Sequence, residues 1–422
     1  MLQSEVKNST ATSSLNLSRG KWLVLIAAFL GWMFDGLEMG IFPLVARPAL
    51  QDLLHVTDDK LIGQWMGYIT ALFLVGAAFG GFIFGWLGDR VGRVRAMTLS
   101  VLTYSIFSGL CYFATVPAHL GIFRFLSALG MGGEWALGVA LVMECWPQNK
   151  RPLLAGLIGA AGNAGYVLIA LLGIKFKVTV DSWRWVMLAG AAPAVLSIFI
   201  NFFVPESERW KEAAKKDSSS PLKEIFSARL RKATLIGIAL ASVALIGTWG
   251  SVQWLPLWAD QMAGSTMPKA KAYTQIAAAV GAMFGCFGGS LLAGKMGRRP
   301  AYFLLCLGSL GICAYLFRFL HEFNALFLVT VFFTGAITAA FYGWTPLYLP
   351  ELFPTRVRAT GQGLSYNFGR ILAAVGVLQM GSLMQHYNGS YAKAGATISL
   401  IYIVGMGIIW LAPETKGRPL PE

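Results

Sequence analysis

Residues 22–46 read WLVLIAAFLGWMFDGLEMGIFPLVA, an apolar run whose only charged side chains are the carboxylates of Asp35 and Glu38. About 20 apolar residues form a helix that crosses the ~30 Å hydrocarbon core of a bilayer, so this run predicts a membrane-spanning helix. A carboxylate near the middle of such a helix costs about 2.5–3.5 kcal/mol, and such groups face a cavity or a partner and mark ion or substrate pathways. We therefore expect Asp35 and Glu38 to take part in transport.

The composition also places the chain among membrane proteins. Hydrophobic residues make up 56% of the 422 residues, charged residues only 13%, and the mean hydropathy is +0.61, whereas a soluble domain carries about 25% charged residues. The net charge of +14 could indicate nucleic-acid binding, but most Lys and Arg residues fall in the tails and in alternate loops, which is the positive-inside bias of membrane proteins. We predict a lipid bilayer as partner and no nucleic acid.

The pattern of apolar segments predicts an all-α integral membrane protein with twelve transmembrane helices. The segments are residues 22–46, 61–87, 96–115, 118–143, 153–174, 184–204, 233–258, 273–294, 301–320, 325–349, 361–384 and 397–412. An even number of spans places both termini on one side, and the basic loops indicate that this side is the cytoplasm. The predicted location is the cell membrane, which is the inner membrane if the source is bacterial.

The chain divides into two six-helix bundles. Residues 21–204 and 233–412 form the predicted bundles, residues 205–232 a basic cytoplasmic linker, and residues 1–20 and 413–422 the cytoplasmic tails. Short motifs recur between the bundles at nearly equal offsets, which predicts a duplicated unit. The pairs are Gly92-Arg93 with Gly297-Arg298 (297 − 92 = 205), Glu144 with Glu351 (351 − 144 = 207) and Pro205-Glu-Ser207 with Pro413-Glu-Thr415 (413 − 205 = 208).

The same motifs resemble those of the major facilitator superfamily. GWLGDRVGRVR at residues 85–95 is similar to the superfamily's signature between helices two and three. Residues 124–151, PESERW at 205–210, PELFP at 350–354 and PETKG at 413–417 are similar to segments of the sugar porters and of the metabolite/proton symporters for sialate, aromatic acids and monocarboxylates. The resemblance covers the chain from Lys21 onward, and it implies two pseudo-symmetric bundles, rocker-switch alternating access and a monomer.

The resemblance further implies a gate of ion pairs at the cytoplasmic helix ends, which closes when the central site opens outward. The gate residues would be Asp89, Arg90, Gly92, Arg93, Glu144, Arg151, Glu351 and Arg358. Gly294 stands at the position that corresponds to Asp89, so we expect an asymmetric gate. The alternative is ordinary positive-inside charge without a gating role, because exposed ion pairs contribute only about 0–1 kcal/mol.

Four charges within the predicted spans of the first bundle are candidates for proton coupling: Asp35, Glu38, Arg124 and Glu134. Asp35 and Glu38 share a helical face with their Cβ atoms about 5–6 Å apart, and two buried carboxylates cannot both ionise cheaply. The resemblance implies an acid in helix one against an arginine in helix four, and Asp35-Gly-Leu-Glu38 resembles the Asp-Gly-x-Asp element of aromatic-acid symporters. We expect Asp35 to carry the proton. The alternatives are a structural ion pair for Asp35, and for Glu134 a hydrogen bond to a neighbouring helix.

Arg370 is the deep charge of the second bundle, and its planar guanidinium suits bidentate capture of a carboxylate; it could equally complete the cytoplasmic gate. Aromatic walls with a few polar groups describe small-molecule sites. The predicted substrate site adds Asn163, Tyr166, Gln253, Trp254, Tyr342, Trp344, Tyr366 and Asn367. Residues 342–346 read YGWTP where sugar porters carry Gly-Pro-x-x-Trp, which weakens a sugar reading.

The remaining motifs exclude other classes. The five cysteines show no metal-ligand spacing, and no Walker A motif or catalytic constellation is present, so we predict neither a metal, nor a cofactor, nor an enzyme. Glycines at 156, 159, 162 and 165 and at 281, 285, 288 and 289 predict close helix packing. The favoured function is proton-coupled symport of a small organic carboxylate. The alternatives are a sugar or polyol transporter, a facilitator or proton antiporter for a neutral or cationic solute, and a transporter-like sensor.

Overall fold

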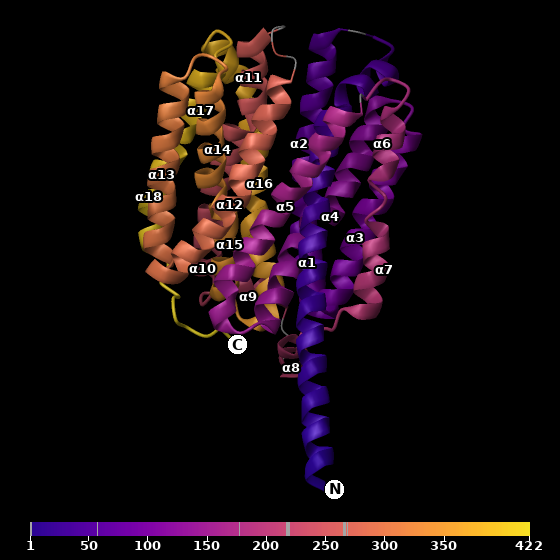
Figure 1. Cartoon of the computed structure of the whole chain (residues 1–422), viewed down its shortest axis with the longest axis vertical. Coiled ribbons are helices and arrows are strands. Elements are labelled where there is room, and N and C mark those ends of the chain that lie inside the picture. The colour runs from indigo at the N-terminus through magenta and orange to yellow at the C-terminus, as the bar shows by residue number, and fades with distance from the viewer. Residues whose placement is uncertain (1, 57, 177, 217–219, 265–266, 268) are drawn as a thin grey trace.

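The computed structural model is helical in all its regular elements over the residues that it describes, which are 2–56, 58–176, 178–216, 220–264, 267 and 269–422. The helices form two bundles that stand side by side (Figure 1). The first bundle consists of α1 (Leu2–Leu54), α2 (Asp59–Val91), α3 (Arg93–Leu110), α4 (Pro117–Cys145), α5 (Arg151–Lys175), α6 (Trp183–Ala189) and α7 (Ala194–Phe203). Two short helices, α8 (Glu208–Lys216) and α9 (Pro221–Ile225), lie in the linker.

The second bundle repeats this plan with more interrupted helices. It consists of α10 (Arg231–Gly250), α11 (Leu255–Ala263), α12 (Ala270–Met296), α13 (Arg298–Phe319), α14 (Ala325–Ala339), α15 (Phe341–Leu352), α16 (Arg358–His386), α17 (Tyr391–Ser399) and α18 (Ile401–Ile408). The pairs α10 with α11, α14 with α15, and α17 with α18 each make one continuous apolar span, as α6 and α7 do in the first bundle.

Eleven helical segments in the described part are long and apolar enough to cross a membrane. The twelfth is α16, whose 29 residues occupy the position of the predicted eleventh span. The predicted all-α membrane fold with twelve helices is therefore confirmed. Its first span is longer than predicted, Arg19–Leu54 rather than residues 22–46, and its last begins earlier, at Tyr391. The reason is that a helix continues through polar residues at its ends, where hydropathy gives no signal.

Glycines allow the close helix contacts that the sequence predicts, except at Gly288, where a Cβ atom would have no other atom within 4 Å. A Cβ atom on Gly36 of α1 would lie 1.9 Å from the carbonyl oxygen of Gly162 in α5, and one on Gly285 of α12 would lie 1.8 Å from the carbonyl oxygen of Ala336 in α14. Between the bundles, a Cβ on Gly159 would lie 2.4 Å from the carbonyl oxygen of Tyr342. Backbones that approach this closely leave no room for a larger residue.

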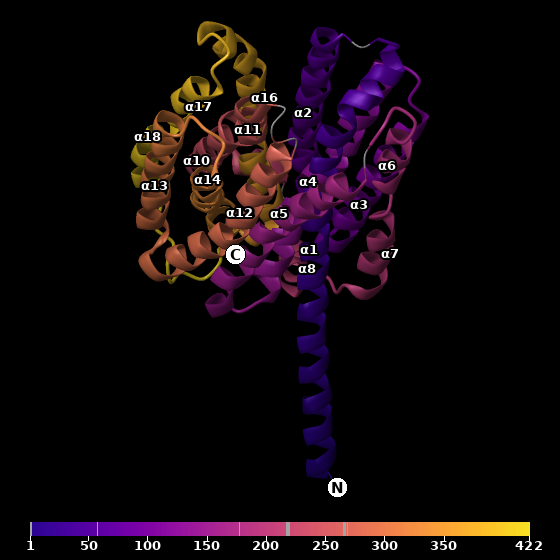
Figure 2. The same cartoon turned by 45° about the horizontal axis from the view of Figure 1, so that its top comes forward.

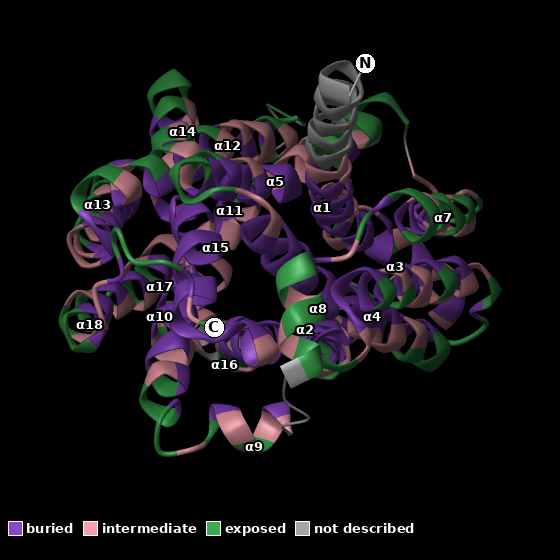
Figure 3. Cartoon of the chain, turned by 90° about the horizontal axis from the view of Figure 1, so that it is seen from below, coloured by how far each residue is buried: buried purple, intermediate pink, exposed green. Residues whose placement is uncertain are grey.

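The bundles meet along two pairs of helices. Viewed from below, α2 lies next to α16 and α5 lies next to α12 (Figure 3). We call the end of the molecule that carries residues 89–93, 144–151 and 351–358 the lower end, as it is oriented in Figure 1. In the part of the chain that the structure describes, the hydrogen bonds that join the bundles lie between this end and the middle of the helices. The upper halves diverge in the tilted view (Figure 2).

Candidate functional site

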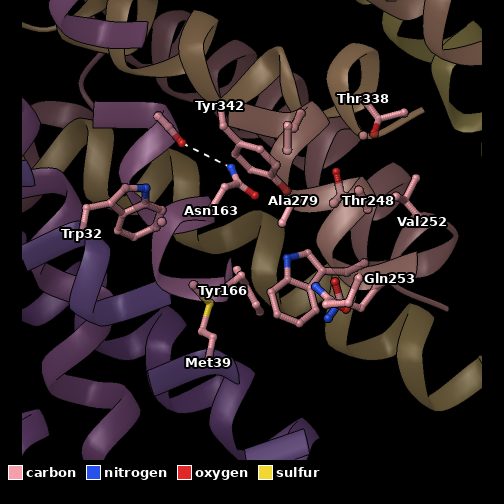
Figure 4. Close-up of a pocket in the computed structure, with 18 of the residues that line it drawn as sticks. Trp32, Met39, Asn163, Tyr166, Thr248, Val252, Gln253, Ala279, Thr338 and Tyr342 are labelled. Carbon is pink, nitrogen blue, oxygen red and sulfur yellow. Dashed lines mark hydrogen bonds between the residues drawn. The ribbon is translucent and has the colours of Figure 1, made fainter. Parts of the chain in front are cut away.

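A cavity of about 110 Å³ lies between the bundles (Figure 4). Six of the nine predicted substrate residues line it: Asn163, Tyr166, Gln253, Tyr342, Tyr366 and Arg370. The sequence reasoning missed several further lining residues, among them Trp32, Met39, Thr248, Trp249, Gln275 and Thr338. Their helices were predicted. In a span that is apolar on all sides, however, the sequence does not indicate which face of the helix points to the opposite bundle.

The other three predicted substrate residues do not line the cavity. The Trp344 indole packs among Tyr302 and Tyr348 in the second bundle and donates a 2.9 Å hydrogen bond to the carbonyl oxygen of Arg298. Asn367 packs against the first bundle, where Nδ2 donates to the carbonyl oxygen of Gly132 at 3.2 Å. Trp254 stacks on Tyr391, with ring centroids 6.3 Å apart. These three positions have structural contacts instead.

Arg370 is a nearly buried cation on the cavity wall. Its side chain comes from α16, and the residue is 2% exposed. The guanidinium carbon lies 5.2 Å from the ring centroid of Tyr366, one helical turn earlier. Nη1 has no hydrogen-bond partner among the described residues. A buried guanidinium nitrogen without a partner is costly, so an anion in the cavity would stabilise this arrangement.

Glu38 forms the buried ion pair with Arg124. Arg124 Nη1 donates to Glu38 Oε1, the Ser108 hydroxyl donates to Oε2 at 2.8 Å, and the Ser127 hydroxyl donates to Oε1 at 3.1 Å. The guanidinium also lies over the ring of Phe73, 4.3 Å from its centroid. This carboxylate is therefore fully satisfied. The arginine of helix four is paired with Glu38 and not with Asp35, because Asp35 lies nearly one turn before Glu38 and points to a different part of α4.

Asp35 and Glu134 face each other in the interior of the first bundle. Both are at most 1% exposed, and their carboxyl groups are close enough to share a hydrogen bond. The Glu134 carboxyl lies against Gly31, one turn before Asp35, where a Cβ atom would be 1.4 Å from Oε1. Among the described residues, no N–H or O–H group donates to either oxygen of Asp35 or to Oε2 of Glu134. Two carboxyl groups can hydrogen-bond to each other only when one of them holds a proton.

Asp89 binds across the boundary between the bundles at the lower end. Its Oδ2 accepts hydrogen bonds from the backbone N–H of Thr360 at 2.8 Å and from the Thr360 hydroxyl at 2.5 Å, and Oδ1 accepts from Arg93 at 2.7 Å. Arg93 continues to Glu144 Oε1 at 3.2 Å and to the carbonyl oxygen of Thr355 at 2.7 Å. Arg358 donates to the same Glu144 oxygen at 2.8 Å. These side chains are buried.

The second bundle carries an equivalent ion pair, of which the sequence reasoning included Glu351 in the predicted gate but left out Arg298. Arg298 donates to both oxygens of Glu351, at 3.0 Å and 2.6 Å. Arg298 follows Arg93 at the repeat offset, 298 − 93 = 205, so the signal was available in the sequence. At the position of Asp89, Gly294 packs against Pro152. The described structure is therefore asymmetric at this position, because the first bundle carries the carboxylate of Asp89 and the second bundle carries Gly294.

The remaining predicted gate residues have local contacts. Arg151 donates Nε to the carbonyl oxygen of Met143 at 3.1 Å, in the same way that Arg358 donates to Pro350 at 3.2 Å. Arg90 is exposed and lies 5.0 Å from the ring centroid of Trp86. Gly92 has a φ angle of 110°, and a Cβ atom there would lie 2.4 Å from Glu206 Oε2. That position accepts only glycine without strain.

The glutamates of the two Pro-Glu-Ser/Thr motifs bind the helix that begins after each repeated glycine. Glu206 accepts a hydrogen bond from the N–H of Val94 at 3.0 Å, and Glu414 accepts from the N–H groups of Arg298 and Arg299 at 3.0 Å and 3.1 Å. Burial alone would raise the pKa of Glu414, but these donors and the N–H groups of Lys416 and Thr415 outweigh burial and hold the pKa below its usual value. Each motif thus caps a helix N-terminus with a carboxylate.

The C-terminal residues lie against the same gate. Arg358 Nη2 donates to the carbonyl oxygen of Pro421 at 2.8 Å, and the side chain of Gln148 in the first bundle donates to the carbonyl oxygen of Arg418 at 2.9 Å. Leu420 is 3% exposed. No sequence signal predicts this contact, because backbone carbonyl groups accept it.

Two matching helical bundles around a central cavity that is closed at one end define a membrane transport protein. The chain belongs to the Major Facilitator Superfamily, whose family model matches residues 22–377. A relative from Haemophilus influenzae that is named for metabolite transport is 30% identical over 94% of this chain and 98% of its own. The cis,cis-muconate transport protein of Acinetobacter baylyi is 28% identical and covers 90% of each chain. The protein is accordingly a multi-pass membrane transporter of metabolites.

The solved structures agree on the fold. The proton:xylose symporter XylE, bound to 6-bromo-6-deoxy-D-glucose, superposes with a TM-score of 0.81 at 18% identity and covers 96% of this chain and 98% of its own. At this identity the likeness concerns the fold alone.

Proposed function

We propose that the protein is a proton-coupled symporter of a small organic carboxylate. The observation that carries the proposal is the unpartnered Nη1 of Arg370 on the wall of the cavity between the bundles. A planar guanidinium binds a carboxylate in bidentate geometry, and the aromatic rings of Tyr166, Tyr342 and Tyr366 provide apolar walls. The relative named for cis,cis-muconate transport, whose substrate is a carboxylate, supports the same class.

Proton coupling is assigned to the carboxyl pair of Asp35 and Glu134. The pair lacks donors among the described residues, whereas Glu38 is held by Arg124, Ser108 and Ser127. A group that is already neutralised by a buried arginine gains little from a proton, and an acid pair without donors gains much. Asp35 with Glu134 is therefore the proton site, and the pair of Glu38 with Arg124 keeps α1 and α4 in register.

Transport proceeds by rocker-switch alternating access in a monomer, since one chain supplies the whole cavity. The hydrogen bonds across the lower end describe the state that is closed on that side. With the termini in the cytoplasm, this is the outward-facing state, and inward opening breaks the bonds of Asp89, Glu144 and Arg358 that cross the boundary. During this opening, the ion pair of Arg298 and Glu351 holds the lower end of the second bundle together.

The experiment uses purified protein in proteoliposomes with cis,cis-muconate and benzoate as labelled probes. An inward proton gradient should drive accumulation, and Asp35→Asn should abolish accumulation while exchange of internal for external probe continues. Arg370→Lys should weaken acid uptake, and Arg318→Lys, at an exposed position near the upper end of α13, serves as its control. Uptake by the wild type that ignores the gradient would refute symport, and an Arg370→Lys variant with normal acid affinity would refute the carboxylate assignment.

The same measurement separates the competing functions. A proton antiporter would take up its solute in exchange for protons that leave the liposome. An outward proton gradient would therefore drive accumulation. A sensor would bind in a thermal-shift screen of mono- and dicarboxylates, sugar acids and neutral sugars but show no counterflow. Asp35 is fully buried and is not part of the cavity wall, which disfavours direct contact between this acid and a cationic solute.

A further inference from the structure

Two aromatic rings meet where α4 of the first bundle crosses α16 of the second. The ring centroids of Trp135 and Tyr366 are 4.0 Å apart, and their planes are 20° from parallel. The two residues are 4% and 3% exposed. Trp32 of α1 packs on Trp135 as well, with a centroid distance of 6.4 Å. Tyr366 and Trp32 line the cavity, whereas Trp135 does not.

Each ring lies next to a residue that binds a ligand in the proposed function. Trp135 is next to Glu134 of the proton site, and Tyr366 is next to Arg370 of the substrate site. Trp135 follows Glu134 in the chain, so a movement of the Glu134 backbone moves the indole. Tyr366 lies one turn before Arg370 and under its guanidinium, 5.2 Å from ring centroid to Cζ. The backbone link from Glu134 to Trp135, the stacked rings, and the contact of Tyr366 with Arg370 thus connect the acid pair to the guanidinium.

Two amide side chains fix the register of the stack. Gln362 Nε2 donates to the carbonyl oxygen of Ala136, and Asn367 Nδ2 donates to that of Gly132 at 3.2 Å. The amide oxygens, Gln362 Oε1 and Asn367 Oδ1, have no hydrogen-bond partner among the described residues. A buried amide whose oxygen has no hydrogen-bond partner stabilises the closed contact less than a fully hydrogen-bonded amide does. A weaker contact is easier to separate in each transport cycle.

We propose that Trp135 is the positioning residue that couples the proton site to the substrate site, an inference that rests on the proposed function. Inward opening separates α4 from α16 and must separate the stacked rings. A substrate carboxylate on Arg370 competes with the Tyr366 ring for the guanidinium, and a proton on the acid pair replaces the repulsion between Asp35 and Glu134 with a hydrogen bond. The rings separate readily when both ligands are bound, and they oppose opening when only one is present.

The test compares Trp135→Leu and Trp135→Phe with the wild type in proteoliposomes. The ratio of protons to labelled carboxylate is measured from the gradient at which net uptake reverses. An aromatic pair contributes enough that we expect Trp135→Leu to lower the accumulation ratio about two- to tenfold, while exchange continues. Trp135→Phe, which keeps an aromatic face, should restore most of the coupling, a result that a role in stability alone would not give. Trp185→Leu, at an exposed ring near the upper end, is the matched control.

The outcomes distinguish a failure of this inference from a failure of the proposed symport function. Normal coupling in Trp135→Leu together with loss of coupling in Asp35→Asn would overturn the inference and leave the symport intact. Normal coupling in both variants would overturn the proposed function. If Trp135→Leu cannot be purified, Trp135→Met fills the same space without an aromatic face, and the same reduction in coupling is expected from it.

Discussion

Arg358 of the second bundle and Arg93 of the first donate hydrogen bonds to the same oxygen of Glu144, at 2.8 Å and 3.2 Å. One buried carboxylate thus holds the bundles together at the lower end. Replacing Glu144 by Gln leaves Arg358 with a neutral partner, whereas Arg93 keeps Asp89, and breaking a buried ion pair costs about 3–5 kcal/mol. Because this cost falls on the closed state, the variant should favour the state that is open at the lower end.

Spin labels report this shift directly. With the five native cysteines replaced, labels at Lys150→Cys and Lys295→Cys, on opposite bundles, should lie farther apart in Glu144→Gln than in the parent. The control is Glu208→Gln, because Glu208 forms an exposed pair with Lys211 within α8 and such pairs contribute about 0–1 kcal/mol. An unchanged distance in Glu144→Gln would contradict the gate.

The two acids of helix one should differ in stability. Glu38→Gln leaves the buried Arg124 without a charged partner, and we expect a loss of about 3–5 kcal/mol of unfolding free energy. Asp35→Asn removes no hydrogen bond from a described N–H group, and the new amide can still hydrogen-bond to Glu134, so its change should stay below about 1 kcal/mol. Denaturant unfolding in detergent micelles measures both variants. Equal losses would mean that Asp35 is as firmly held as Glu38.

Two glycines of α12 form a matched pair for the packing argument. Gly285→Ala places a Cβ atom 1.8 Å from the carbonyl oxygen of Ala336, so α12 and α14 must separate, at a cost of about 1–3 kcal/mol. Gly288 has no atom within 4 Å of the corresponding position, and alanine there should gain about 0.5–1 kcal/mol from helix propensity. Thermal unfolding of the two variants should therefore move in opposite directions. A loss of stability in both would show that the glycines act through backbone conformation.

Glu414 makes stability depend on pH. Its pKa in the folded protein is lower than the usual 4.5 because backbone N–H groups stabilise the charged form. The carboxylate therefore contributes stability above the usual pKa, and this contribution is lost as the pH falls through the folded pKa. The melting temperature of the wild type should exceed that of Glu414→Gln at about pH 7, and the difference should shrink towards about pH 3. Glu212→Gln, on the exposed face of α8, should show no such convergence.

The fold could be read from the sequence because apolar length, loop charge and repeat offsets each depend on local composition. Although their role as a gate stays a prediction, the charged residues at the lower helix ends followed from the motifs that resemble the major facilitator superfamily. The pairing of the membrane acids did not, because it depends on how α1 and α4 rotate about their axes. Asp35 and Glu38 differ by three positions, and this rotation assigns Arg124 to one and Glu134 to the other. A contact between Trp135 and Tyr366 is equally invisible in sequence, since 231 positions (366 − 135) separate them.

Gly294 sets how closely the two bundles approach each other at the lower end. A Cβ atom at this position would lie 3.0 Å and 3.1 Å from two ring carbons of Pro152 on the other bundle, and a proline ring cannot rotate away. Any residue with a side chain would therefore push Pro152 away by a few tenths of an ångström. The absence of a side chain at Gly294 thus lets the second bundle lie closer to the first at this position than an aspartate would allow.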